Sequence, residues 1–156
     1  MNVSIVNKQT FFSFDEASSI FLVQAVLEAE GVICDEVSIT FLDAGEIANL
    51  HGEFFDDPTP TDCISFPLDS DDDSGYRILG DVFVCPRVAY DYVEANDGDV
   101  YEEVALYIIH GLLHLIGYDD IEEKDIKDMR AAEERCAIAV KDAGISLRHK
   151  KKYSGM

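Results

Sequence analysis

The sequence predicts an α+β fold, in which a small mixed sheet of four strands is covered by helices. Two observations carry this prediction. Strand and helix patterns follow one another in the order strand, helix, strand, helix, two strands and three helices. The chain has 156 residues, of which 47% are hydrophobic and 28% charged, as is usual for a single globular domain. We expect one domain over residues 1–146, followed by a basic, disordered tail over residues 147–156.

The chain begins with a strand pattern over residues 2–6. Ser13 and Glu16 have the spacing of a capping box, and the apolar period that follows them ends before Gly31. Because a glycine commonly follows the last turn of a helix, this pattern predicts a helix over residues 14–30.

Alternating apolar and polar side chains over residues 37–41 predict a strand with one buried face. Asp43 can cap a short helix that runs to about residue 51. The segment 52–62 contains two prolines, which remove backbone donors, so we expect a stiff loop there and no helix. A further strand is predicted over residues 63–67.

The second half of the chain is mainly helical. Residues 77–85 complete a hairpin with the preceding strand, and a proline opens a predicted helix over residues 86–96. Asp99 can cap the next helix, which ends at Gly117. The last helix is predicted over residues 121–142, where acidic and basic residues recur at helical spacing.

Charge and composition exclude several classes of protein. The net charge of −20 repels polyanions, which argues against a general nucleic-acid binder and favours basic protein partners. The longest uncharged stretch, residues 104–118, is shorter than the ~20 residues that a membrane span needs. The N-terminus lacks a signal-peptide pattern, and four scattered cysteines are typical of reduced thiols. We expect a cytoplasmic protein without a membrane anchor or an organic cofactor.

The segment HGLLHLIGYDD, residues 110–120, has the pattern of a metal site. His110 and His114 lie about 40° apart on a helix, so both imidazoles can reach one ion. Gly117 can end the helix and turn the chain back, which lets Asp120 face the same ion. Two histidines and one carboxylate leave the fourth position of a zinc site open to water, as in catalytic sites.

Other interpretations of this segment stay open. Both histidines could be hydrogen-bonded core residues, because apolar side chains flank them. His51 and His149 are alternative third ligands, although one lies on a short helix and the other in the predicted tail. The spacing also resembles that of metzincin proteases, which predicts a metzincin-like metal helix. Gly111, however, replaces their glutamate base, which favours phosphodiester hydrolysis over peptide hydrolysis.

Three motifs resemble the YbeY family of bacterial endoribonucleases that mature ribosomal RNA. Residues 110–119 match the family signature H-G-x-L-H-L-x-G-Y-D-H until Asp120 replaces its third histidine. Residues 60–67, PTDCISFP, resemble the family's PTDVLSFP, and residues 79–82, LGDV, resemble its LGDI. With two matches in the last helix, Met129 and Glu133, the resemblance spans roughly residues 37–136.

The resemblance implies a metal-dependent hydrolase domain with one Zn²⁺ per chain, held by His110, His114 and Asp120. It implies a catalytic role for His114, together with water at the open position. It also implies a substrate cleft between the histidine helix and the strand 63–67. The residues expected to bind substrate in this cleft are Thr61, Asp62, Ser65 and Phe66.

The implied activity is single-strand-specific cleavage of ribosomal RNA, chiefly at the 3′ end of the small-subunit RNA, with a role in ribosome quality control. The implied partners are ribosomal RNA, the small ribosomal subunit and its basic proteins. The net charge supports an alternative, a non-catalytic ribosome-assembly factor that zinc only stabilises. A metalloprotease is disfavoured by Gly111.

One departure from the family concerns phosphate binding. The family has a tyrosine and an arginine shortly before its PTD motif, where this chain has Phe54 and Phe55, followed by Asp56 and Asp57. The basic group that could hold a phosphate is therefore missing from this position. Replacements for it elsewhere in the chain are Arg77, Arg87 and the basic tail.

Overall fold

The computed structural model describes residues 1–68 and 75–149. It confirms the α+β prediction, with a four-stranded mixed sheet and helices packed against it. In chain order the elements are β1 (Asn2–Asn7), α1 (Glu16–Ala29), β2 (Glu36–Phe41), α2 (Ala44–Phe55), β3 (Cys63–Pro67), β4 (Ile78–Val84), α3 (Pro86–Asn96), α4 (Val100–Ile116) and α5 (Glu123–Asp142).

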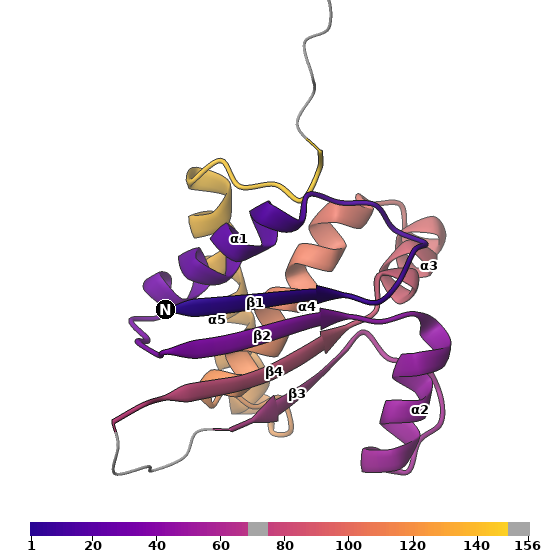
Figure 1. Cartoon of the computed structure of the whole chain (residues 1–156), viewed down its shortest axis with the longest axis horizontal. Helices are drawn as coiled ribbons and strands as arrows, with labels where there is room; N and C mark the ends of the chain where they lie inside the picture. The colour runs from indigo at the N-terminus through magenta and orange to yellow at the C-terminus, as the bar shows by residue number, and fades with distance from the viewer. Residues whose placement is uncertain (69–74, 150–156) are drawn as a thin grey trace, which may run out of the picture.

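The strand order in the sheet is β1-β2-β4-β3. β1, β2 and β4 are parallel, and β3 pairs with β4 in the antiparallel direction, so β3 is an edge strand. The helices α1, α4 and α5 gather above and behind the sheet, whereas α2 lies apart from them at lower right (Figure 1). The three helices cover one face of the sheet, and α2 packs beside the other face through a smaller cluster.

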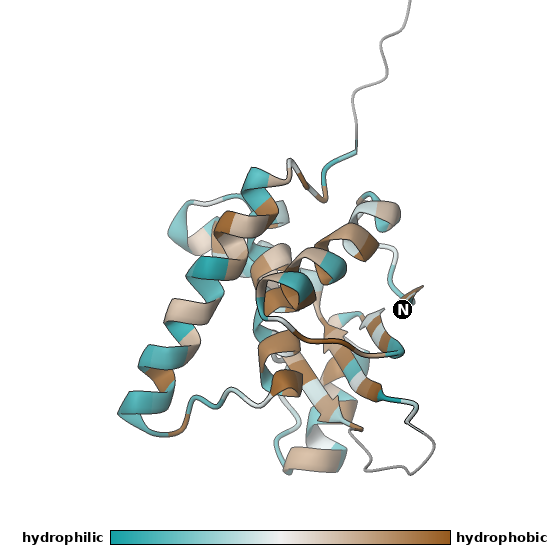
Figure 2. Ribbon diagram, turned by 90° about the vertical axis from the view of Figure 1, so that its left-hand side faces the viewer, coloured by the Kyte–Doolittle hydropathy of each residue, from teal (hydrophilic) through white to brown (hydrophobic). Residues whose placement is uncertain are grey.

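The larger core lies between the sheet and helices α1, α4 and α5. Val37, Ile39 and Phe41 alternate along β2 and pack there with Leu22 of α1 and Leu112 of α4. Hydrophobic residues concentrate where the helices meet the sheet (Figure 2). A smaller cluster on the α2 side contains Leu42, Ile47, Ile64 and Cys85.

The central helix α4 begins and ends at the residues that the sequence indicated. Asp99 accepts hydrogen bonds from the backbone N–H groups of Tyr101 and Glu102, at 2.8 and 3.4 Å. At the other end Gly117 has φ = 119°, a conformation that favours glycine, and the chain turns back there. This turn directs the residues after Gly117 toward the last turns of α4.

Gly111 allows α4 to approach the sheet closely. A Cβ atom at this position would lie 2.4 Å from Cγ1 of Val82 and 3.3 Å from Oγ of Ser65. The Ser65 hydroxyl donates a hydrogen bond to the Gly111 carbonyl oxygen at 2.8 Å, which ties β3 to α4. The absence of a side chain at Gly111 therefore sets the distance between the histidine helix and the edge strand.

We expect Gly111→Ala to lower the free energy of unfolding by about 1–3 kcal/mol, because a methyl group would overpack this contact. Gly45→Ala is the matched control. Gly45 is also helical, and a Cβ there would meet only one carboxylate oxygen, at 3.5 Å. Urea unfolding of both variants checks the expectation, and an equal loss of stability in the two would contradict it.

The structure differs from the sequence predictions near two helices. We predicted that the second helix would end near residue 51, but α2 continues to Phe55 and ends where Asp56 adopts a left-handed conformation. The two prolines, Pro58 and Pro60, lie beyond the end of the helix and do not shorten it. The predicted capping box also does not form, because Asp15 is the N-cap of α1 and its side chain makes no capping hydrogen bond.

The packed domain continues past the predicted boundary at residue 146. Leu147 is only 1% exposed, and its carbonyl oxygen accepts a hydrogen bond from Asp15 N–H at 2.8 Å. His149 lies 2.8 Å from the Ser13 hydroxyl. The rest of the predicted tail, residues 150–156, lies outside the described residues.

The cysteines agree with the expectation of reduced thiols. All four are free, with Cys34, Cys85 and Cys136 buried and Cys63 half-buried. Within the described ranges, no helix is both long enough and apolar enough to cross a membrane.

Candidate metal centre

Three side chains converge at the C-terminal end of α4. The Nε2 atoms of His110 and His114 lie 3.0 Å apart, and an Asp120 carboxylate oxygen lies 3.5 Å from each of them. Two ligands bound tetrahedrally at about 2.1 Å from a zinc ion lie roughly 3.4 Å apart. The separations of these three atoms therefore fit one shared ion.

The centre faces solvent on one side. The side chains of His110 and His114 are 23% and 27% exposed, and that of Asp120 is 47% exposed. A water molecule or a substrate oxygen can therefore approach the three donor atoms from outside. The alternative interpretation of this motif is a pair of hydrogen-bonded core histidines. Such a buried pair would not present its ring nitrogens to solvent in this way.

Each histidine is oriented through its other ring nitrogen. Nδ1 of His110 lies 2.9 Å from an oxygen of Glu133 on α5, and Nδ1 of His114 lies 3.0 Å from the carbonyl oxygen of Tyr118. Both partners are acceptors, so each Nδ1 carries the proton and each Nε2 is left as the metal-binding atom. The hydrogen bond to Glu133 also raises the pKa of His110, so protons compete with a metal as the pH falls.

The turn after α4 is itself held by α1 and α5. The Tyr118 hydroxyl donates to Glu30 at 2.7 Å, and Arg135 donates to the same carboxylate at 2.8 Å. The hydrogen bond from Arg135 is the main reason why the pKa of Glu30 is lowered. These contacts fix Tyr118, whose carbonyl oxygen orients His114.

Cys63 lies beside the centre but is a poor candidate for a ligand. Burial, followed by the charges of Asp62, Asp120 and Glu133, holds the pKa of this thiol well above its ordinary value. Its sulfur does not belong to the group of donor atoms that His110, His114 and Asp120 form in the described chain. The same carboxylates make the surroundings of the histidines strongly acidic.

The residues predicted to bind substrate occupy two different surroundings. Ser65 faces α4, where its hydroxyl bonds to Gly111, and Asp62 accepts a hydrogen bond from Cys63 N–H at 2.7 Å. The Thr61 hydroxyl donates to Asp62 at 3.2 Å. Phe66 points to the other face of β3, because neighbouring side chains alternate along a strand. The predicted set is thus split by the edge strand.

The two alternative third ligands lie in other contacts. His51 Nδ1 is 2.8 Å from the carbonyl oxygen of Thr59, and His149 Nε2 bonds to the Ser13 hydroxyl. Among the described residues, Asp120 is the third member of the metal-binding group that contains His110 and His114. Sequence reasoning identified this group, but it noted Glu133 only as a motif match and missed Glu30 and Arg135.

Comparisons with known proteins show the family of this chain. The sequence model described as "Endoribonuclease YbeY" matches residues 4–141. Endoribonuclease YbeY of Protochlamydia amoebophila is 48% identical over 133 residues, which cover 85% of this chain and 89% of that protein. Endoribonuclease YbeY of Chlamydia caviae is 40% identical over 152 residues, which cover 94% and 96%.

A solved structure supports the fold. The solution structure of a Thermotoga maritima protein superposes with a TM-score of 0.65 and covers 92% of this chain and 91% of that one, at 23% sequence identity. Likeness at this identity concerns the fold alone, whereas the family match and the chlamydial relatives concern the sequence over most of its length. The chain therefore belongs to the YbeY family.

Proposed function

We propose that this chain is a metal-dependent, single-strand-specific endoribonuclease of ribosomal RNA processing. The relatives are named endoribonucleases, which makes RNA the substrate and hydrolysis the reaction. The observation that carries the metal dependence is the convergence of His110, His114 and Asp120 on one solvent-facing point. On the basis of the family resemblance, we further propose that the chain matures the 3′ end of the small-subunit RNA and takes part in ribosome quality control.

The donor set fits one zinc ion per chain. Two imidazole nitrogens and one carboxylate oxygen suit zinc, and three protein ligands leave a position for substrate. A zinc ion held there would supply a Lewis acid for the phosphodiester and lower the pKa of water. Glu133 keeps His110 in the binding tautomer, and the Tyr118 carbonyl does the same for His114, the histidine to which we assign a direct part in catalysis.

Gly111 argues against peptide hydrolysis by a metalloprotease mechanism. A side chain at this position would run into Val82 of the sheet, so the position has no room for a glutamate base. Phosphodiester hydrolysis would not need a base at this point of the helix, because a metal ion held by His110, His114 and Asp120 would supply a Lewis acid that lowers the pKa of water, the nucleophile.

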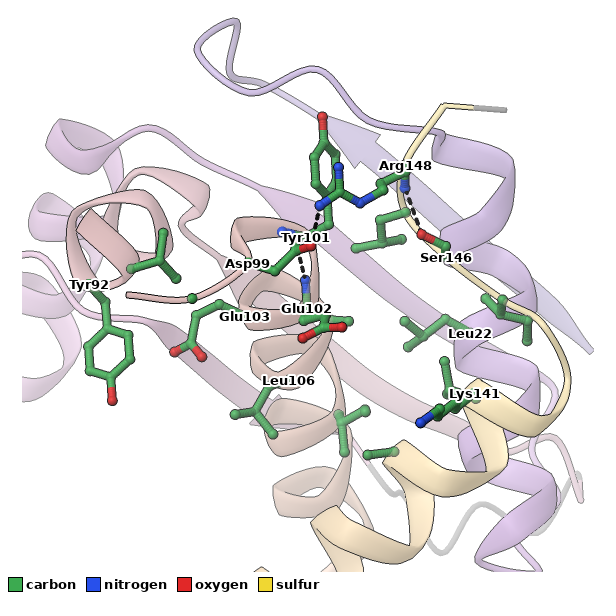
Figure 3. A pocket seen from close by; sticks show the side chains of 18 of the residues that line it. Leu22, Tyr92, Asp99, Tyr101, Glu102, Glu103, Leu106, Lys141, Ser146 and Arg148 are labelled. Atoms are coloured by element: carbon green, nitrogen blue, oxygen red, sulfur yellow. Dashed lines mark hydrogen bonds and ion pairs between the residues drawn. The ribbon is translucent and has the colours of Figure 1, made fainter. Parts of the chain in front are cut away.

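A non-catalytic assembly factor is the second candidate function, and one groove of the chain suits a protein partner that either function would need. The groove, of about 810 Å³, lies away from the histidines, between the N-terminal half of α4 and the C-terminal end of α5. Leu22 and Leu106 point into it, and Arg148 crosses its upper edge to Asp99 (Figure 3). Its acidic residues are Asp97, Asp99, Glu102 and Glu103, and its basic residues are Lys141 and Arg148.

An apolar floor with a largely acidic rim suits a basic, amphipathic segment. We therefore assign this groove to a basic protein of the small ribosomal subunit. Such a contact would serve the endoribonuclease as well as an assembly factor, because both must be placed on the subunit. The two functions are separated only by the chemistry at the histidines.

Cleavage of end-labelled RNA distinguishes them. We expect the zinc-loaded protein to cut a single-stranded RNA and to leave the same sequence intact in a duplex, and we expect a chelator to stop the cutting. Asp120→Ala protein purified in parallel controls for contaminating ribonucleases. Intact single-stranded RNA after incubation with the zinc-loaded protein would favour the assembly factor, and cleavage of casein would favour the protease.

A further inference from the structure

Two neighbouring phenylalanines at the end of α2 are unusually exposed. Phe54 and Phe55 are 57% and 55% exposed, and their ring centroids lie 5.0 and 6.4 Å from the ring of Phe66 on β3. We call Phe54, Phe55 and Phe66 the aromatic platform. Neighbouring apolar side chains that remain exposed in a folded protein are typical of surfaces that bind a ligand or a partner.

The aromatic platform is not what anchors α2. Ile47 is the buried residue of this helix, and it packs with Leu42 and Ile64 in the smaller core cluster. Phe54 and Phe55 are not part of that cluster. Phe54 contacts the ring of Phe66, and Phe55 contacts the rings of Phe66 and of His51, whose centroid lies 5.7 Å away. Their exposed faces therefore remain available to a ligand.

The aromatic platform lies across the edge strand from the metal centre. Phe66 follows Ser65, whose hydroxyl is bonded to the carbonyl oxygen of Gly111, the residue next to His110. β3 is the last strand of the sheet, so no further strand of the described chain separates its open edge from solvent. A single strand of RNA that passes from the histidines over this edge would meet the rings on the other face of β3.

The charges around the two sites favour contacts to bases over contacts to phosphates. Neither residues 44–67 nor residues 100–116 contain a lysine or an arginine, whereas the first segment contains five acidic residues and the second contains two. Phosphate neutralisation, which supplies most of the affinity of basic RNA-binding proteins, is therefore weak beside the histidines. Stacking of bases on aromatic rings does not depend on protein charge and requires bases that are not paired.

We propose that Phe54 and Phe55, supported by Phe66, form a nucleobase-stacking site for the single-stranded RNA that flanks the cleaved bond. The inference rests on the proposed function for its ligand, and it explains how a chain of net charge −20 can hold RNA. It also gives a structural reason for a preference for single strands, because the bases of a duplex are stacked on one another and not free to stack on the rings.

The test measures binding, so that its outcome is independent of cleavage. The full-length, zinc-loaded protein is titrated at 4 °C against two fluorescently labelled RNA oligonucleotides, and a gel checks that the RNA stays intact. One oligonucleotide is an ordinary single strand, and the other has the same length and charge but several consecutive abasic nucleotides. Phe54→Leu/Phe55→Leu removes the rings and keeps apolar side chains, and Phe54→Tyr/Phe55→Tyr keeps the rings.

We expect the double leucine variant to bind the ordinary RNA about 5-fold to 150-fold more weakly, as for the loss of one stacked base. Its affinity for the abasic RNA should equal that of the wild type, and the salt dependence should not change because no phosphate contact is lost. The double tyrosine variant should bind as the wild type does. Phe21→Leu on α1 is the matched control, since Phe21 is also 57% exposed, and it should have no effect.

Equal affinity of the wild type and the double leucine variant for ordinary RNA would overturn the proposal, and the aromatic platform would then be assigned to a protein contact. An equal loss of affinity for ordinary and abasic RNA would overturn it as well, because the rings would not be reading bases. If the zinc-loaded protein cuts no RNA but shows the expected binding pattern, the proposed function fails and the stacking site stands.

Discussion

Asp120→Ala should remove most of the bound zinc and lower RNA cleavage more than 100-fold, whereas Asp120→His should keep both. Asp120 supplies the carboxylate oxygen that lies 3.5 Å from each histidine Nε2 atom. Alanine leaves two ligands, and changes of residues that only orient a ligand already cost about 10–100-fold. Histidine supplies a nitrogen donor at a bond length close to that of the carboxylate oxygen.

Asp119→Ala is the control for Asp120. Asp119 is adjacent in the chain and accepts a hydrogen bond from Asp120 N–H at 2.8 Å, but it is not part of the metal-binding group. The Asp119→Ala variant should therefore retain zinc. Asp120→His should also move the pH–rate profile to lower pH, because it removes one negative charge beside the ion. Full zinc in Asp120→Ala together with loss of zinc in Asp119→Ala would reverse the assignment.

Removal of the metal should lower the melting temperature by about 8–16 °C. A ligand that is present at about 1,000 times its dissociation constant stabilises the native state by about 4.1 kcal/mol, and each kcal/mol corresponds to about 2–4 °C in a chain of this size. The ion would link the end of α4 to the turn at Asp120. Glu133 would extend this link to α5, because its carboxylate holds His110.

Differential scanning calorimetry of the protein in zinc and in chelator measures this shift. The Asp120→Ala variant should melt at nearly the same temperature in both, which separates the effect of the site from effects of zinc elsewhere on an acidic surface. Identical melting curves of the wild-type protein in zinc and in chelator would contradict a metal centre that contributes to stability.

Local signals explain why most of the fold could be predicted. The bounds of β3 and α3 agree with the prediction, because prolines and turn residues mark their ends. The C-terminal end of α2 was wrong by four residues, since it depends on the left-handed conformation of Asp56, which an aspartate adopts only in some contexts. The burial of Leu147 depends on its contact with the start of α1, far away in the sequence.

The candidate site likewise combines residues that local patterns predict with residues that only tertiary packing brings together. His110, His114 and Asp120 lie within eleven residues, so the helical period and the turn at Gly117 suffice to bring them together. Glu133 is 23 residues from His110, and Arg135 is 105 residues from Glu30. Contacts of this kind follow from the packing of α1 and α5 against α4, which no local pattern indicates. The aromatic platform depends likewise on how α2 meets the edge strand.

Titration of metal-free protein with zinc, followed by the initial rate of single-stranded RNA cleavage, tests the central claim most directly. Our account predicts a rate near zero without zinc, a linear rise as zinc is added and a plateau at about one zinc ion per chain, as expected for a single three-ligand site. A rate that does not depend on zinc, or the absence of cleavage when zinc is in excess, would contradict it.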